Sequence, residues 1–151
     1  MTFTTKEDYG LRAVLDIAVQ GGDGPVQARE IAARQQIPEQ FLEQLLAGLR
    51  RAEVIRSIRG AGGGYVLADD PTRVTVGAVL RALSGPLLPH ELVDGTPGEP
   101  HSLADVPEVA IVRGVWRELR AALLQVTEGL TIAELLERRV SSRDAFFAMH
   151  I

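Results

Sequence analysis

The apolar residues near the start of the chain recur at the spacing of an amphipathic helix. The pattern spans residues 5–20, and its members are Leu11, Val14, Leu15 and Ala18. Thr5 followed by Asp8 three residues later is a helix-capping pair, so we expect Thr5 to be the N-cap. The glycines and the proline of residues 21–25 end this helix.

Two further helices are expected before residue 53. Ile31 and Ala32 lie on one face of a short segment over residues 27–36, which indicates a small packed helix. Pro38 suits the first helical position because its missing N–H costs nothing there. The apolar positions that follow match the i, i+3, i+4, i+7 template of a helix ending near Ala52, and they are Leu42, Leu45, Leu46 and Leu49.

A β-hairpin is predicted after the third helix. Residues 54–59 alternate apolar and polar side chains, and a second short apolar stretch follows at residues 65–67. Four of the five residues between them, 60–64, are glycines, which permit positive φ and leave a tip without side-chain bulk. Residues 75–84 form another amphipathic helix. The expected fold class is therefore mainly α with a small β-hairpin, and residues 1–84 form a winged helix-turn-helix.

The remainder of the chain divides into a connector and a dimerisation segment. Residues 85–107 contain five prolines and three glycines, which predicts an irregular connector. Over residues 108–151, apolar positions spaced alternately three and four apart form a heptad seam that needs a partner helix, and a second copy of the chain is the most available one. The predicted homodimer interface consists of Val109, Val112, Trp116, Leu119, Leu123 and Val126.

The end of the chain is expected to hold one more short helix and a packed tail. Ile132, Leu135 and Leu136 would face inwards from a helix over residues 131–139. The tail after it ends in four apolar side chains that we expect to pack against the protein, namely Phe146, Phe147, Met149 and Ile151.

Composition excludes several classes of protein. With 46% hydrophobic and 24% charged residues and no apolar run of roughly 18 residues, the chain is expected to be soluble, without a membrane partner. Its first residues carry no secretory signal, so the expected location is the cytoplasm. The sequence contains no cysteine, which excludes disulfides, thiolate zinc sites and cysteine-ligated iron–sulfur clusters.

The net charge of the chain does not favour binding to nucleic acid, but the distribution of charge along the sequence does. The net charge of −4 argues against non-specific binding to DNA, but the excess of acid lies entirely after residue 84. Residues 48–60 hold four arginines against the single Glu53, and these are Arg50, Arg51, Arg56 and Arg59. This segment is the expected source of phosphate contacts.

The second helix of a helix-turn-helix lies in the major groove of DNA. Opposite its leucines, the helix over residues 38–52 presents amide and carboxylate groups suited to base edges, from Glu39, Gln40, Glu43 and Gln44. The alternative interpretation is a solvated helix face, and the adjoining arginines and glycine hairpin favour DNA. Arg59 stands at the mouth of the glycine turn, where we expect its guanidinium to enter the minor groove while the amide of Gly60 approaches phosphate. The alternative is an ordinary exposed hairpin arginine.

Enzymatic and metal-binding alternatives have little support. The glycine run lies between two strands and lacks the lysine and hydroxyl of a P-loop. His90 and His101, with nearby carboxylates in the connector, make a metal site conceivable, but no residue pair has helical metal-ligand spacing. We therefore expect no metal, no cofactor and no enzymatic activity, and Trp116 is interpreted as an interface anchor.

Several strings of residues resemble the Rrf2 family of transcription regulators. They are Thr4-Thr5-Lys6, Tyr9, Leu11-Arg12-Ala13, Phe41-Leu42-Glu43-Gln44-Leu45-Leu46 and the wing over residues 56–65. Trp116-Arg117 and residues 130–135 are similar to the family's dimer helix and the helix after it. The resemblance implies homodimers and base readout near Gln40 and Glu43. The predicted DNA-binding set is Gln40, Phe41, Glu43, Gln44, Arg50, Arg51, Arg56, Arg59 and Gly60.

The chain also departs from that family. Many relatives carry three cysteines in the connector that hold an iron–sulfur cluster, and this chain has none. It must sense by another route, and cluster-free relatives that regulate cysteine and sulfur metabolism through a metabolite or partner protein offer one. Pro38 and Gln40 stand where the family often has small hydroxyl residues, and Phe41 replaces a frequent tyrosine, so the preferred operator can differ.

Three hypotheses therefore compete. The first is a homodimeric, sequence-specific regulator, most often a repressor, that binds a palindromic operator in double-stranded DNA. The second is a protein-interaction module that kept the winged-helix fold but no longer binds DNA, and the acidic balance motivates it. The third is a metal-dependent enzyme.

Overall fold

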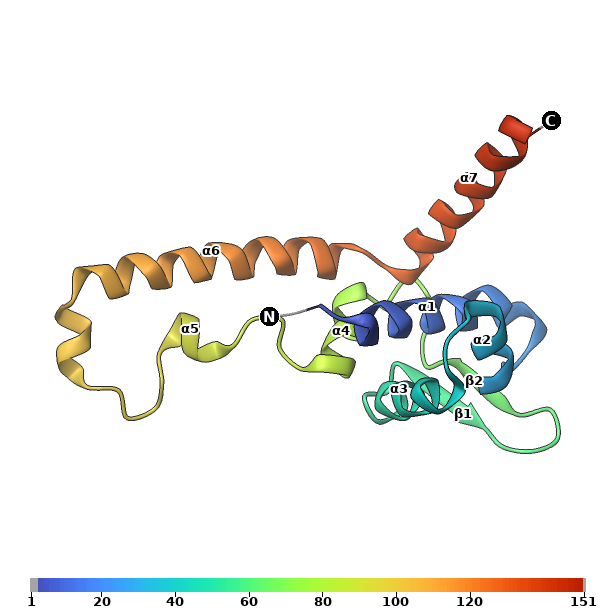
Figure 1. Ribbon diagram of the computed structural model, residues 1–151, viewed down its shortest axis with the longest axis horizontal. Helices are drawn as coiled ribbons and strands as arrows, with labels where there is room; N and C mark the ends of the chain where they lie inside the picture. The colour runs from blue at the N-terminus through green and yellow to red at the C-terminus, as the bar shows by residue number, and fades with distance from the viewer. Residues whose placement is uncertain (1–2, 151) are drawn as a thin grey trace.

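The computed structural model describes residues 3–150, and its elements are mainly helical with one small hairpin (Figure 1). In chain order they are α1 (Thr5–Gln20), η1 (Gly21–Asp23), α2 (Ala28–Gln35), α3 (Glu39–Arg51), β1 (Ile55–Ile58), β2 (Gly64–Leu67), α4 (Val76–Ser84), α5 (His90–Asp94), η2 (His101–Asp105), α6 (Pro107–Gly129) and α7 (Ile132–His150). This architecture confirms the predicted fold class.

The main core lies between α1, α2, α3 and α4, with the start of α7 closing it. All four leucines of the α3 pattern are buried, together with Val14, Ile17 and Ile31. Ile132, the first residue of α7, is fully buried in the same core. Each such side chain contributes about 1.5–3 kcal/mol to folding, so the apolar face of α3 cannot turn away from the body without a large loss.

The N-terminus of α1 differs from the sequence expectation. The N-cap is Thr4 rather than Thr5, and Glu7 rather than Asp8 completes the capping box. Glu7 accepts hydrogen bonds from the amide and the hydroxyl of Thr4, both at 2.8 Å, and from the hydroxyl of Ser84 at the end of α4. The Ser84 hydrogen bond, with those from Thr4, lowers the pKa of the Glu7 carboxyl to about 2 against the opposing effect of burial. Glu7 thus joins α1 to α4.

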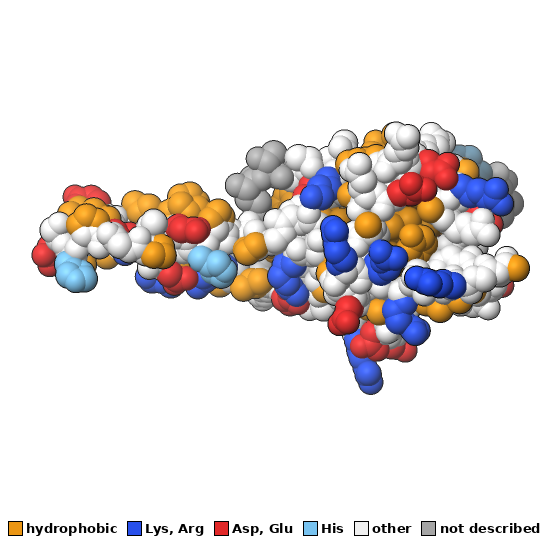
Figure 2. Space-filling view, turned by 90° about the horizontal axis from the view of Figure 1, so that it is seen from below, with side chains coloured by type: hydrophobic (Ala, Val, Ile, Leu, Met, Phe, Trp, Pro, Cys, Tyr) orange, Lys and Arg blue, Asp and Glu red, His pale blue; other side chains and the backbone are white. Residues whose placement is uncertain are grey.

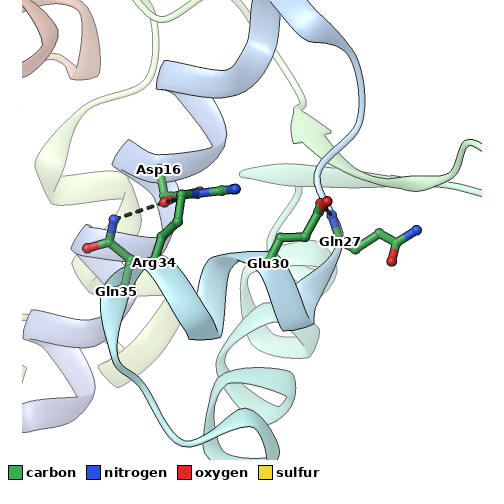
Figure 3. A network of polar contacts seen from close by, with 5 residues as sticks. All are labelled: Asp16, Gln27, Glu30, Arg34 and Gln35. Atoms are coloured by element: carbon green, nitrogen blue, oxygen red, sulfur yellow. Dashed lines mark hydrogen bonds and ion pairs between the residues drawn. The ribbon is translucent and has the colours of Figure 1, made fainter.

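A buried carboxylate holds α2 against α1 (Figure 3). Asp16 of α1 accepts hydrogen bonds from Nε and Nη2 of Arg34 at 3.0 and 2.8 Å, and from Nε2 of Gln35 at 2.9 Å. This pairing raises the pKa of the Arg34 guanidinium above its ordinary value. At the other end of α2, Glu30 accepts from the amide of Gln27 and caps the helix. The Asp16 contacts thus hold the C-terminal end of α2 on α1, whereas the Glu30 contact stabilises the start of α2 itself.

The second half of the chain corrects three expectations. The connector is not wholly irregular, because α5 and η2 lie within it. The helix expected to end near Arg139 continues as α7 to His150, and it projects away from the body (Figure 1). Phe146, Phe147 and Met149 are therefore exposed rather than packed, whereas Ile151 lies outside the described residues.

The body is linked to α6 and α7 by backbone hydrogen bonds. The amide of Val76 donates to the carbonyl of Leu130, and the amide of Ile132 donates to the carbonyl of Val74, both at 2.8 Å. Arg81 of α4 is ion-paired with Glu128 of α6. The long helix α6 therefore leaves the body from a defined junction. None of the helices within residues 3–150 is long and apolar enough to cross a membrane.

Candidate DNA-binding site

The polar face predicted for α3 is exposed in the structure. Gln40, Glu43 and Gln44 lie on the side of the helix opposite its buried leucines, together with Glu39. The helix begins one residue later than expected, since Pro38 is its N-cap and not its first helical residue. Its polar face is free to meet base edges because the core needs none of these side chains.

Phe41 is placed differently from the other residues of the predicted set. It is half-buried and packs edge-to-face against Tyr9 of α1, with 5.7 Å between the ring centroids. The guanidinium of Arg12 lies 5.2 Å from the centre of the Tyr9 ring. An aromatic pair of this geometry contributes about 0.5–1.5 kcal/mol beyond its buried area. The structure thus gives Phe41 a part in positioning α3, and its part in DNA binding stays a prediction.

The four predicted arginines are exposed and are distributed from the end of α3 to the tip of the hairpin. Arg50 and Arg51 end that helix, Arg56 lies on β1, and Arg59 follows β1 at the tip of the hairpin. Among residues 3–150, none of the four is ion-paired with a carboxylate. Seen from the side on which α3 and the hairpin lie, the body carries several Lys and Arg side chains interspersed with carboxylates (Figure 2).

The wing needs glycine at two positions because the backbone passes close to other backbone. A Cβ on Gly63 would lie 2.2 Å from the carbonyl oxygen of Ile58, and a Cβ on Gly64 would lie 2.5 Å from that of Val26. Gly64 also has a φ of 153°. Next to it, Tyr65 and Val26 exchange backbone hydrogen bonds of 2.7 and 2.9 Å. The hairpin is therefore held to the loop before α2.

The wing and α3 lie along the same side of the molecule (Figure 1). A short turn joins them, in which the amide of Val54 donates to the carbonyl of Leu49 at 3.0 Å. The Val26–Tyr65 pairing and the Asp16–Arg34 pair, which fix the wing and α2, were not predicted. Both join residues far apart in the sequence, which periodicity does not reveal.

Only half of the apolar residues in the heptad seam of α6 are exposed. Val109, Trp116 and Leu123 are partly covered by the chain itself, whereas Val112, Leu119 and Val126 are exposed. Two further apolar side chains that were not predicted, Ile111 and Val115, are exposed beside them. The exposed fractions along this strip are 67% for Ile111, 49% for Val112 and Val115, 45% for Leu119 and 59% for Val126. We call these five residues the α6 strip.

Comparison with known proteins supplies the family. The sequence pattern described as Rrf2, iron-dependent transcriptional regulator, matches residues 3–138. The chain belongs to the Rrf2 family. It is 33% identical to the HTH-type transcriptional regulator CymR of Bacillus subtilis over 97% of both chains. It is 36% identical to the regulator IscR of Sodalis glossinidius, over 90% of this chain and 79% of that one.

Solved structures of Rrf2 proteins have the same fold. The structure titled CymR (YrzC), the global cysteine regulator of B. subtilis, has a TM-score of 0.72 at 33% identity and covers 91% of this chain and 98% of that chain. The T. potens IscR structure has a TM-score of 0.70 at 34% identity and covers 92% and 88%. The winged helix-turn-helix and the resemblance to Rrf2 proteins are confirmed. The protein is a DNA-binding transcriptional regulator and not an enzyme.

The word iron in the family's description does not fit this chain's residues. The sequence has no cysteine to hold a cluster. Within residues 3–150, no three His, Asp or Glu side chains are grouped to hold a metal ion. Two connector carboxylates face arginines of α6, since Glu99 is ion-paired with Arg113 and Asp94 lies 3.5 Å from Arg120. The side chains of this protein therefore do not fit an iron–sulfur cluster held by thiolates.

Proposed function

We propose that this regulator binds a palindromic operator as a homodimer, with α3 in the major groove and the wing in the minor groove, and that it acts as a repressor. One observation carries the proposal, namely that the exposed polar face of α3 and the hairpin belong to elements along the same side of the body, and that these elements carry four exposed arginines with no ion pair among residues 3–150. Phosphate contacts from the arginines supply affinity, and amide and carboxylate groups on α3 supply base readout.

The α6 strip supports the homodimer. A monomer rarely exposes five large aliphatic side chains along one helix. A second copy of the chain can cover them symmetrically. We place the interface on this strip together with the predicted seam residues. A twofold dimer presents its two α3 helices to half-sites about 34 Å apart, one turn of the duplex, and this geometry calls for an operator with the same symmetry.

The signal is proposed to be a metabolite or a partner protein rather than a cluster. CymR is the global cysteine regulator of B. subtilis, so we expect the signal of this protein to come from sulfur metabolism. We expect the protein to act in the cytoplasm, where bacterial DNA lies.

Selection of bound sequences from random double-stranded DNA tests the proposal. We expect the full-length protein at fixed salt to enrich a palindromic motif. Arg59→Ala should weaken binding to that motif by about 1–3 kcal/mol and relax its sequence preference next to the α3 contacts. Arg117→Ala, an exposed arginine on α6, is the matched control and should bind as the wild type does.

Two results would contradict the proposal. Failure to enrich any motif would favour the protein-interaction module, which keeps the fold without DNA binding. Equal losses in Arg59→Ala and Arg117→Ala would show that the wing has no special part and that only net charge matters.

A further inference from the structure

A cavity of about 220 Å³ lies where α4, the start of the connector and α6 meet. Most of its wall is apolar. Leu87 and Leu88 come from the connector and are buried, and Leu123 and Leu124 come from consecutive positions on α6. A partly open cavity with mostly aliphatic walls favours an apolar body over water.

Cationic and polar groups stand beside these leucines. Arg81 of α4, His90 at the start of α5 and Arg120 of α6 line the same cavity. Arg81 is already committed, because it is hydrogen-bonded to Glu128. Arg120 is less so, since its carboxylate neighbour Asp94 lies at 3.5 Å and is itself 63% exposed. Arg120 is therefore the cation most available to a bound anion.

We propose that this cavity binds a small carboxylate with an apolar body, and that Arg120 and His90 hold the carboxylate while the leucines cover the rest. The volume equals that of roughly seven water molecules at about 30 Å³ each, which suits a short branched aliphatic chain or a single ring. Arg is the side chain best suited to a carboxylate, because its planar fork donates two parallel hydrogen bonds.

The position of the cavity gives such a ligand a means of control. One wall belongs to α4, which packs on α1 and α3, and the other belongs to α6, which carries the exposed strip. A ligand between them biases the angle at which α6 leaves the body. This regulatory part rests on the proposed dimer on DNA, where that angle sets the distance between the two α3 helices. Couplings of this kind typically change affinity between 5-fold and 150-fold.

Isothermal titration calorimetry of the full-length protein tests the site without DNA. The probes are 4-methylpentanoate and benzoate, each compared with its neutral amide. We expect saturable binding of at least one acid, with the amide about tenfold weaker because it loses the charge-assisted hydrogen bond. Arg120→Gln should weaken binding of the acid about tenfold, and Arg117→Gln, three residues earlier on α6, should leave it unchanged.

A cavity-filling variant separates the site from general effects on folding. Leu124→Trp places a ring in the cavity from a side chain that is partly exposed, so we expect an unchanged circular dichroism spectrum and loss of acid binding. Absence of saturable binding by both acids would overturn the proposal. Equal affinity for acid and amide, or wild-type affinity in both Arg120→Gln and Leu124→Trp, would overturn it as well.

The two proposals fail separately. DNA selection without a probe reports on the proposed function alone. If the protein binds the acids but enriches no motif, the carboxylate site is supported and the proposed binding to an operator is contradicted. A protein that enriches a palindrome but binds neither acid keeps the operator and loses this site.

Discussion

Two neighbouring threonines at the start of α1 differ in what lies opposite them. Thr4 and Thr5 each precede an acidic residue by three positions, so the sequence offers two equivalent caps. The hydroxyl of Ser84 reaches Glu7, and this contact favours the pair formed by Thr4 and Glu7. The local sequence does not distinguish Thr4 from Thr5 as the N-cap. The contact from Ser84, 77 positions after Glu7, favours Thr4.

Glu7 should make the stability of the protein sensitive to acid. Its pKa in the folded protein, about 2, lies below the ordinary value of 4.5, so its stabilising effect is complete above about pH 4.5 and is lost as the pH falls towards 2. The effect is at most on the order of 3 kcal/mol. We expect Glu7→Gln to lower stability at pH 7 and to flatten its decline between pH 5 and 2.

Urea unfolding measures this effect, at a fixed protein concentration because the stability of the proposed dimer depends on concentration. Glu137→Gln, on the exposed part of α7, is the control and should unfold like the wild type at every pH. An acid decline in Glu7→Gln as steep as that of the wild type would show that other carboxylates are responsible.

At the scale of elements, the wing depends on a close approach of two backbones. Gly64→Ala would place a Cβ against the carbonyl of Val26 at a positive φ, so the pairing between Val26 and Tyr65 must give way. We expect a loss of about 1–3 kcal/mol in unfolding free energy and weaker operator binding. Gly62→Ala is the matched control, because its Cβ meets nothing within 4 Å.

Urea unfolding and operator titration of the two variants report on the wing. Gly62→Ala should stay within about 0.5 kcal/mol of the wild type. If Gly64→Ala matched it in both measurements, the attachment of the hairpin to the loop before α2 would have no part in stability or in DNA binding.

The elements differ in how far the sequence could predict them. The strong four-leucine pattern of α3 gave both faces of that helix correctly, and the glycine run gave the hairpin. Periodicity is weak in segments as short as α5 and η2, so the connector was expected to be irregular. The length of α7 was underestimated because Ser141 and Ser142 favour a helix end only mildly, and no glycine or proline follows to break the helix.

The sequence predicted which residues belong to the candidate site, but not how these residues pack against the rest of the protein. Exposure of Gln40, Glu43 and Gln44 followed from the leucine pattern. The packing of Phe41 on Tyr9 and the covering of Trp116 by the chain itself depend on tertiary contacts. A heptad pattern shows which residues are apolar, but not which of them the same chain already covers.

At the scale of the whole molecule, we expect that one charged side chain introduced into the α6 strip dissociates the proposed dimer. Leu119→Glu would bury an unpaired carboxylate in the proposed interface, so the dimer dissociation constant should rise roughly a hundredfold or more. Analytical ultracentrifugation should then show monomers at concentrations where the wild type is dimeric. Operator affinity should fall with it, because two half-sites are no longer held together.

Arg117→Glu places the same side chain on the same helix outside the strip, with a charge change of two units instead of one, and it should remain dimeric. If Leu119→Glu also stayed dimeric and bound DNA normally, the interface would have to lie elsewhere on the molecule.

The separation of the two faces of α3 has a consequence for how this protein changes over time. Folding relies on the leucines, whereas Gln40, Glu43 and Gln44 are left to solvent. Exchanges at such surface positions usually alter stability by no more than about 0.5 kcal/mol. Under the proposed binding mode, new operators can therefore be acquired by successive replacements along this one helix, each tolerated by the fold that carries it.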